Sequence, residues 1–168
     1  KTFFLLLGLS SFSMAQMMQM AKLVADDAAA NDKFGQSVSI SGDYKIVGAY
    51  QDDDAGGQSG SAYIFIRSGT SWSQQAKLVA SDGGQNYHFG ESVSISGNYA
   101  LVGMHGASTS GSNGMVYTFI RSGTSWSQMA KLVAGDGDRN DFFGNSVSIS
   151  GDYAVVGAYF DDDGGNNS

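Results

Sequence analysis

The chain contains no cysteine and no proline, and only two of its 168 residues are histidine. The lack of cysteine excludes disulfides, thiolate metal centres and cysteine nucleophiles. Glu91 is the sole glutamate, so the supply of acid–base side chains is small. Nine basic residues against sixteen acidic ones give a net charge of −7, which argues against binding to nucleic acids or anionic membrane surfaces. This composition favours a protein that is not an enzyme.

Residues 1–15 stand apart from the rest of the chain. A basic start, a short apolar run and a small-x-small ending at Ser13 and Ala15 are typical of a secretory signal peptide. The run is shorter than the roughly 20 residues that a membrane-spanning helix needs. We expect export with cleavage after Ala15, or retention of the segment for assembly with a neighbouring copy. The apolar side chains that would then make the contact are Phe3, Phe4, Leu5, Leu6, Leu7 and Leu9.

Beyond residue 16 the sequence repeats itself. The motif AKLVA recurs around Lys22, Lys77 and Lys131, which are 55 and 54 residues apart. The nine residues IRSGTSWSQ occur unchanged at 66–74 and 120–128. A period near fifty residues indicates propeller blades or a related β array rather than a helical solenoid.

Alternating small polar and β-branched residues predict a strand at 37–41, and turn residues separate it from strands at 44–49, 61–67 and 71–79. We therefore predict an all-β fold of tandem four-stranded antiparallel blades of β-propeller type. Its units are a lead-in strand and loop at 16–35, blade 1 at 36–80, blade 2 at 81–134 and a partial blade 3 at 135–168. Propellers close with about four to eight blades. We expect an incomplete ring, completed by other copies or by the rest of a longer chain.

The serines that alternate along the first strand of each repeat have two interpretations. Small side chains suit the crowded inner strand of a propeller, whereas an exposed row of hydroxyls would suit a repetitive ligand such as a glycan or ice. Crowding is the commoner cause, and we favour it.

The repeats resemble the FG-GAP family, whose integrin members form a β-propeller. Phe-Gly is paired with Val-Gly-Ala-Tyr in the first and third copies, while the middle copy reads Val-Gly-Met-His. The resemblance implies an extracellular propeller used for adhesion or scaffolding. The repeat positions that we take as structural are Phe34, Gly35, Gly48, Ala49, Trp72, Phe89, Gly90, Gly103, Trp126, Phe143, Gly144, Gly157 and Ala158. We interpret the phenylalanines as plugs between blades and the tryptophans as core aromatics rather than a sugar-binding surface.

Acidic loops are the candidate metal sites. Integrin-type repeats carry a calcium loop between Phe-Gly and Gly-Ala, but here a two-residue turn stands in that place, and it offers too few oxygens for calcium. Three adjacent carboxylates repel one another, so a divalent cation or solvation must relieve them. We favour solvation and keep calcium as the alternative. The candidate ligands are Asp52, Asp53, Asp54, Asp136, Asp138, Asn140, Asp161, Asp162 and Asp163.

These observations predict a secreted, non-catalytic protein of the bacterial cell surface that acts in adhesion, scaffolding or structure. Variable loops at 51–60, 105–114 and 160–168 would make its contacts. One alternative is a self-assembling filament subunit, joined through the apolar N-terminus and open blade edges. Another is a glycan-binding module. The expected partners are other copies, a cell-surface protein or a glycan, and no cofactor is expected besides the calcium alternative.

Overall fold

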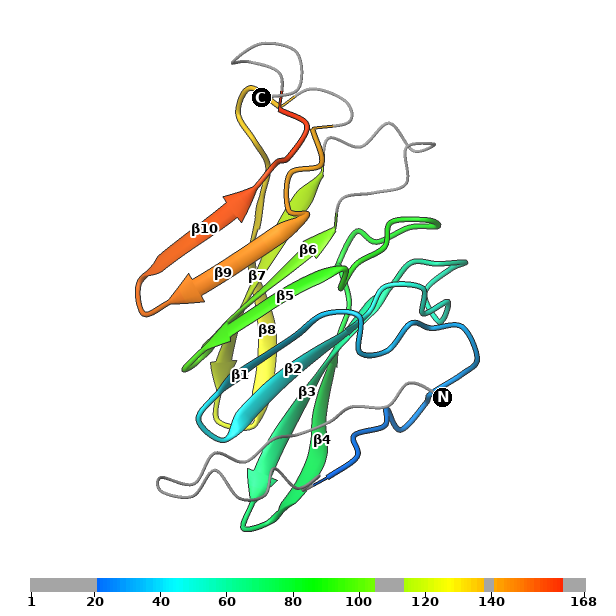
Figure 1. Cartoon of the computed structure of the whole chain (residues 1–168), viewed down its shortest axis with the longest axis vertical. Coiled ribbons are helices and arrows are strands. Elements are labelled where there is room, and N and C mark those ends of the chain that lie inside the picture. The colour runs from blue at the N-terminus through cyan, green and yellow to red at the C-terminus, as the bar shows by residue number, and fades with distance from the viewer. Residues whose placement is uncertain (1–20, 105–113, 138–140, 162–168) are drawn as a thin grey trace, which may run out of the picture.

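The computed structural model describes residues 21–104, 114–137 and 141–161, and this part of the chain is all-β with no helix. Its ten strands form three antiparallel sheets that follow one another along the long axis of the molecule (Figure 1). The strands are β1 (Val38–Ser41), β2 (Tyr44–Ala49), β3 (Ser61–Ser68), β4 (Ser71–Leu78), β5 (Ser92–Ser96), β6 (Tyr99–Met104), β7 (Met115–Ser122), β8 (Ser125–Leu132), β9 (Ser146–Ser150) and β10 (Tyr153–Gly157). The prediction of tandem blades in an unclosed array is confirmed.

Each complete blade is a meander of neighbouring strands. Blade 1 has the order β1-β2-β3-β4 and blade 2 the order β5-β6-β7-β8, while β9 and β10 form the described part of blade 3. Tight turns join β1 to β2 and β3 to β4, and Gly42 adopts φ +56, a conformation that side chains with a Cβ rarely take. Both complete blades carry a register shift at the same place, between Ile64 and Phe65 and between Thr118 and Phe119. The repeated sequence therefore specifies the same irregularity twice.

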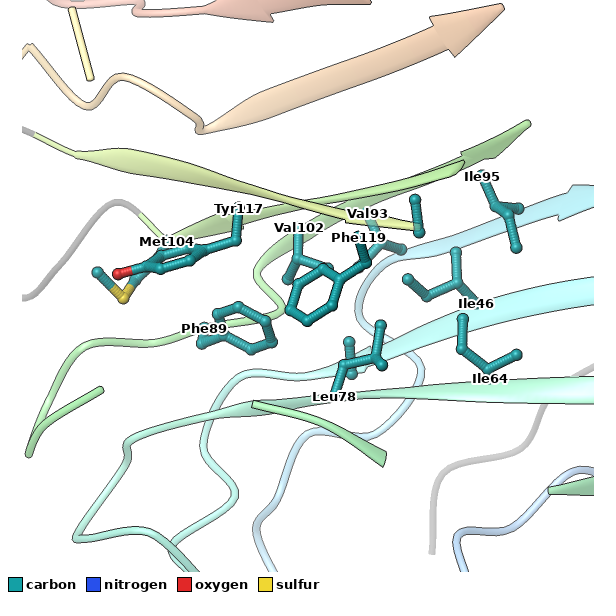
Figure 2. Packing of buried hydrophobic residues seen from close by; sticks show 12 residues of the cluster. Ile46, Ile64, Leu78, Phe89, Val93, Ile95, Val102, Met104, Tyr117 and Phe119 are labelled. Atoms are coloured by element: carbon teal, nitrogen blue, oxygen red, sulfur yellow. The ribbon is translucent and has the colours of Figure 1, made fainter. Parts of the chain in front are cut away.

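The main hydrophobic core lies between blades 1 and 2 (Figure 2). Blade 1 contributes Ile46, Ile64 and Leu78, which point toward Phe89 and Phe119 on the side of blade 2. All five side chains are almost completely buried. Burying each one stabilises the fold by roughly 1.5–3 kcal/mol, so packing between blades 1 and 2 contributes strongly to stability. No helix of the described residues is of a length and hydropathy that would let it cross a membrane.

A second cluster covers the other face of blade 1. Leu23 and Ala25 of the lead-in segment pack against Phe34, Tyr63 and Phe65. In the main core the equivalent positions are taken by Leu78 and Ala80, at the end of an outer strand. The recurrence of AKLVA in the sequence thus has a structural reason, because the lead-in segment takes the same place against blade 1 that the end of β4 takes against blade 2.

The alternating serines link the inner strands of consecutive blades. The Ser39 hydroxyl oxygen accepts a hydrogen bond from the Ile95 amide at 3.2 Å, and Ser94 accepts one from Ile149 at 3.0 Å. Ser37 in turn donates to the Gly90 carbonyl at 2.7 Å. These hydroxyls are therefore used in contacts between blades.

Candidate functional site

Two loops of consecutive blades join at one edge of the array (Figure 1). The loop after β2 and the loop after β4 are connected by backbone hydrogen bonds from Asn86 to Gly57 at 2.8 Å, from His88 to Gln58 at 3.2 Å and from Phe89 to Ser59 at 3.0 Å. We call residues 50–60 and 79–91 the loop rim. Its backbone is held in place by these bonds, so its exposed side chains stand on a defined surface.

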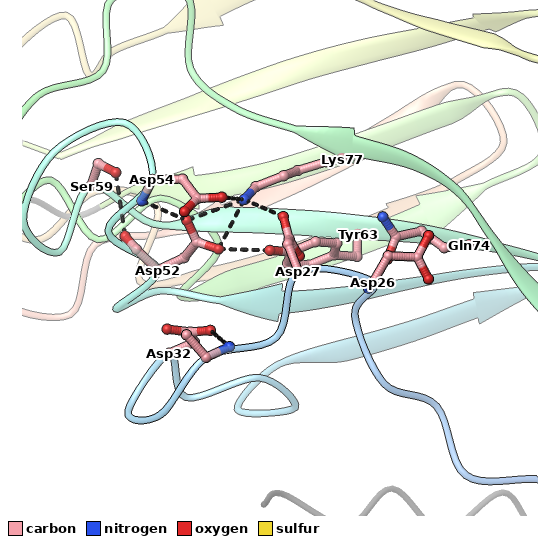
Figure 3. A network of polar contacts seen from close by, with 10 residues as sticks. Asp26, Asp27, Asp32, Asp52, Asp54, Ser59, Tyr63, Gln74 and Lys77 are labelled. Atoms are coloured by element: carbon pink, nitrogen blue, oxygen red, sulfur yellow. Dashed lines mark hydrogen bonds and ion pairs between the residues drawn. The ribbon is translucent and has the colours of Figure 1, made fainter.

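Next to the loop rim, one ammonium group meets three carboxylates (Figure 3). The Nζ atom of Lys77, on β4, lies 2.7 Å from Asp27, 3.0 Å from Asp52 and 2.6 Å from Asp54. The sheet supplies the lysine, the lead-in segment supplies Asp27, and the loop after β2 supplies the other two carboxylates. An ammonium has three donors, and here each one has its own carboxylate.

Asp52 is the centre of this group of side chains. Its side chain is only 4% exposed, and it accepts a 2.6 Å hydrogen bond from the Tyr63 hydroxyl and a 3.2 Å bond from the Asp54 amide. The backbone carbonyl of Asp52 also accepts a bond from Ser59. Asp52 is therefore a structural carboxylate that ties the loop to β3 and β4, rather than a solvated member of an acidic run.

The contacts shift several pKa values. Burial by itself lowers the pKa of Lys77, but its interactions with Asp27, Asp54, Tyr63 and Asp52 outweigh that effect and hold the pKa above the ordinary lysine value. Burial raises the pKa of Asp27, and the interactions with Lys77 and Tyr63 reverse that shift and leave the pKa low. The pKa of Tyr63 is raised by burial and by its bond to Asp52. At neutral pH the lysine and Asp27 are charged and the tyrosine hydroxyl remains a donor.

Blade 2 contains a smaller version of this group. Tyr117 donates to Asp82 at 2.8 Å, and the Nζ atom of Lys131 lies 2.6 Å from the same carboxylate. Asp82 is half-exposed. Tyrosine, lysine and the lead-in aspartate thus recur with the repeat, whereas Asp52 and Asp54 belong to blade 1.

The carboxylates around Lys77 include a possible set of metal ligands. Oxygen atoms of Asp27, Asp52 and Asp54 lie within 4.8 Å of one another, and the lysine ammonium is bonded to all three. The protein therefore supplies its own cation at this place. Calcium binding by the acidic loops remains a prediction.

The other predicted ligands are dispersed. Asp53 and Asp136 are exposed, and Asp161 is half-buried beyond β10. Asp138, Asn140, Asp162 and Asp163 lie outside the described residues, as do the predicted assembly residues Phe3, Phe4, Leu5, Leu6, Leu7 and Leu9. The structure thus brings together Asp52 and Asp54 from that list.

Phe89 and Trp126 lie between blades 1 and 2, whereas Phe34 and Trp72 lie in the cluster on the other face of blade 1. Phe34 and Phe89 are buried, Phe143 is half-buried, and Trp72 and Trp126 sit half-buried at the margins of the two clusters. A Cβ on Gly48 would lie 1.9 Å from the Gly90 carbonyl oxygen, and one on Gly103 would lie 2.1 Å from that of Gly144. Glycine is therefore required where the blades approach most closely.

Lys77, Tyr63 and Asp27 are not among the site residues that the sequence predicts. One signal pointed to them, since a lysine recurs inside the otherwise apolar motif AKLVA. A lysine that recurs in each copy of an apolar segment needs an oppositely charged partner. An aspartate also recurs, because Asp27 and Asp82 precede the Phe-Gly motif of their repeats by similar distances.

No curated protein matches the sequence. A family model for the FG-GAP repeat matches it three times, at residues 17–65, 72–119 and 126–168. The second and third matches begin in the outer strands β4 and β8, and the first and second end in β3 and β7, so the matched unit runs from an outer strand into the next blade. The matches span most of the chain, and the protein belongs to the FG-GAP repeat family.

Proposed function

We propose that this protein is a non-catalytic, secreted adhesion or scaffolding module of the bacterial cell surface. The blades form a rigid platform, and the loop rim contacts a cell-surface protein or glycan. The main support is the fixed backbone of the loop rim. Hydrogen bonds join its two loops, which belong to consecutive blades, and the ion pair between Asp52 and Lys77 anchors the first loop to β4. A surface ordered before binding loses little conformational entropy when a partner docks.

Export is part of this proposal. It is supported by the basic start, the apolar run and the small residues before Gln16. The test is expression of the full precursor in a bacterial host, followed by mass spectrometry of the exported protein. A mature N-terminus at Gln16 is the expected result, and protein confined to the cytoplasm would contradict it.

Binding by the loop rim can be tested with beads coated with the protein, on bacterial cells and on a glycan array. We expect replacement of the exposed residues Asp53, Ala55 and Gln58 by serine to abolish adhesion. This variant retains the buried Asp52, so its blades are expected to fold. The matched control replaces Ser68 and Thr70, exposed in the β3–β4 hairpin outside the loop rim. Equal loss in both variants, or no adhesion by the wild type, would overturn the proposal. Hits confined to the array would favour the glycan-binding alternative.

A second candidate function is that of an extracellular filament subunit. It is favoured by exposed apolar residues on the open face of blade 1, where Val38 is 48% and Ile40 is 57% exposed. Exposed apolar surfaces of this kind mark sites of association between proteins. Electron microscopy of the purified chain tests this function, and filaments or large arrays are expected.

A further inference from the structure

A tyrosine, a glutamine and a histidine meet where the two loops of the loop rim join. The ring centroids of Tyr50 and His88 lie 5.4 Å apart with an interplanar angle of 83°, so the rings pack edge to face. The Nε2 atom of His88 lies 3.2 Å from the Oε1 atom of Gln58. Because a carboxamide oxygen can only accept, the imidazole carries a proton on Nε2. One imidazole of the second loop therefore contacts both side chains of the first loop.

The backbone at His88 is specified by the repeat, whereas the side chain is not. His88 adopts φ +58, and the residues that precede Phe-Gly in the other two repeats, Lys33 and Phe142, adopt φ +58 and +56. This left-handed conformation is uncommon for residues other than glycine, so its recurrence is a property of the repeat. The side chain is different in each repeat. The packing of the blades therefore does not explain why a histidine stands at position 88.

These three side chains are accessible inside the blade array rather than at one of its ends. Blades 1 and 2, which supply the two loops, are both complete four-stranded sheets. Gln58 is nevertheless exposed, and Tyr50 and His88 are only half-buried. A partner can therefore reach all three at an interface that is complete within the chain.

Two of the side chains offer hydrogen-bond donors on a fixed backbone. The Gln58 carbonyl accepts a bond from the His88 amide at 3.2 Å, which holds the first loop against the second. Within the described parts of the chain, the Tyr50 hydroxyl and the Gln58 amide nitrogen make no hydrogen bond. Donors beside aromatic rings match the chemistry of a pyranose. Its hydroxyl oxygens accept hydrogen bonds, and its C–H groups are attracted to the negative face of an aromatic ring.

The charges of the loop rim favour a neutral sugar. Its two loops contain no lysine or arginine and five acidic residues, which are Asp52, Asp53, Asp54, Asp82 and Glu91. A sulfated, phosphorylated or carboxylated sugar would be repelled by this surface. A cationic peptide would have to compete with a lysine of this chain, because Lys77 already pairs with Asp52 and Asp54.

We propose that Tyr50, Gln58 and His88 form a subsite for one neutral pyranose of a cell-surface glycan. The rings of Tyr50 and His88 pack against the C–H groups of the sugar. The Tyr50 hydroxyl and the Gln58 amide donate hydrogen bonds to its hydroxyl oxygens. The subsite rests on the function proposed for the loop rim and gives that surface a neutral glycan as its ligand.

The test is isothermal titration calorimetry of the full chain with the methyl glycosides of galactose, glucose and mannose, and with methyl glucuronide. We expect binding of at least one neutral glycoside and weaker binding of the acidic one. Gln58→Ala and Tyr50→Phe each remove one donor and are expected to weaken binding about 5-fold, the loss of one ordinary hydrogen bond. Gln36→Ala is the matched control, because Gln36 is exposed outside the loop rim, and it is expected to bind like the wild type.

Both donor variants are expected to keep the blades folded, since Gln58 is exposed and phenylalanine retains the ring that packs on His88. Melting temperatures equal to that of the wild type will verify this. No binding of any neutral glycoside would overturn the subsite. So would tighter binding of methyl glucuronide, or a loss in Gln36→Ala as large as in Gln58→Ala.

The cell-adhesion assay distinguishes a failure of the subsite from a failure of the proposed function. Adhesion that depends on the loop rim but is not inhibited by any of the neutral glycosides would overturn the subsite and leave a protein as the partner of the rim. Binding of a neutral glycoside by a wild type that does not adhere to cells would support the subsite and overturn the adhesive function.

Discussion

The hydroxyl of Ser94 lies 3.0 Å from the amide nitrogen of Ile149, although the two residues are 55 positions apart in the chain. The bond connects the inner strands of blades 2 and 3, and it reproduces the contact between Ser39 and Ile95 one blade earlier. Side-chain hydroxyls thus satisfy backbone amides that face a neighbouring sheet and cannot pair within their own sheet.

Replacing Ser94 by alanine tests the strength of this link. Ser94 is buried, so the change leaves the Ile149 amide without its acceptor, and we expect a loss of about 1 kcal/mol in unfolding free energy. Urea denaturation measures the loss. Ser148→Ala is the matched control, since Ser148 is exposed on the last described sheet, and at low protein concentration its effect is expected to stay within about 0.5 kcal/mol. Equal effects would contradict a role between blades.

Gly48→Ala is expected to be severely destabilising. The new Cβ would lie 1.9 Å from the Gly90 carbonyl oxygen, so the two blades would have to separate, at a cost of about 3 kcal/mol or more. Gly157→Ala is the control, because the atom nearest its Cβ would be the rotatable hydroxyl of Ser146, and the next two atoms lie 3.7 and 3.8 Å away. Thermal unfolding compares the two variants. A Gly48→Ala variant as stable as the control would show that the approach of the blades is less tight than described.

Lys77→Met removes the cation shared by three carboxylates. We expect a loss of about 3 kcal/mol, the lower end of the cost of leaving a buried charge unpaired, since Asp52 is buried and Asp54 is largely exposed. Lys131→Met is the control and is expected to lose about 1 kcal/mol or less, because its partner Asp82 is half-exposed.

The same variant tests the calcium alternative. With the ammonium gone, oxygens of Asp27, Asp52 and Asp54 within 4.8 Å of one another form a candidate ligand set. We expect calcium to raise the melting temperature of Lys77→Met more than that of the wild type, in which the ammonium occupies the place. A rise of the same size in both proteins would place calcium elsewhere.

Acid is expected to weaken the attachment of the lead-in segment to β4, which the ion pair between Asp27 and Lys77 makes. The pKa of Asp27 is lower in the folded chain than its ordinary value of 3.8, so the unfolded chain binds its proton more readily. The ionised Asp27 carboxylate stabilises the folded chain fully at pH values above 3.8, and this stabilisation is lost as the pH falls through the pKa of Asp27 in the folded chain. Denaturation midpoints between pH 2 and pH 6 measure it, and the Asp27→Asn variant is expected to show a shallower decline than the wild type. An identical decline would exclude this contribution.

The high pKa of Lys77 acts at the opposite end of the pH scale. Because the folded value lies above the ordinary 10.5, the unfolded chain loses its proton first as the pH rises. The contribution of Lys77 is complete below the ordinary value and is lost only in stronger alkali, so it is constant across the neutral range.

The local pattern of the sequence was sufficient to predict the strands and their turns. Serine alternating with valine or isoleucine specifies a strand with two different faces, and glycine at position 42 specifies the tight turn that follows it. The repeat then extends this prediction to every blade. Family membership follows from the same local motifs, which the family model matches three times.

The tertiary structure decided what the serines and charges contact. Ser94 and Ile149 meet because two sheets stack at a particular offset, and no local pattern encodes that offset. Asp27, Asp52 and Lys77 come from a lead-in segment, a loop and an outer strand, and Asp27 joins the other two only because the lead-in segment packs against blade 1. The sequence by itself determined the strands and turns of each blade, through the alternation of its side chains. Only the packing of one blade on another decided which polar groups are buried, and therefore which of them require partners.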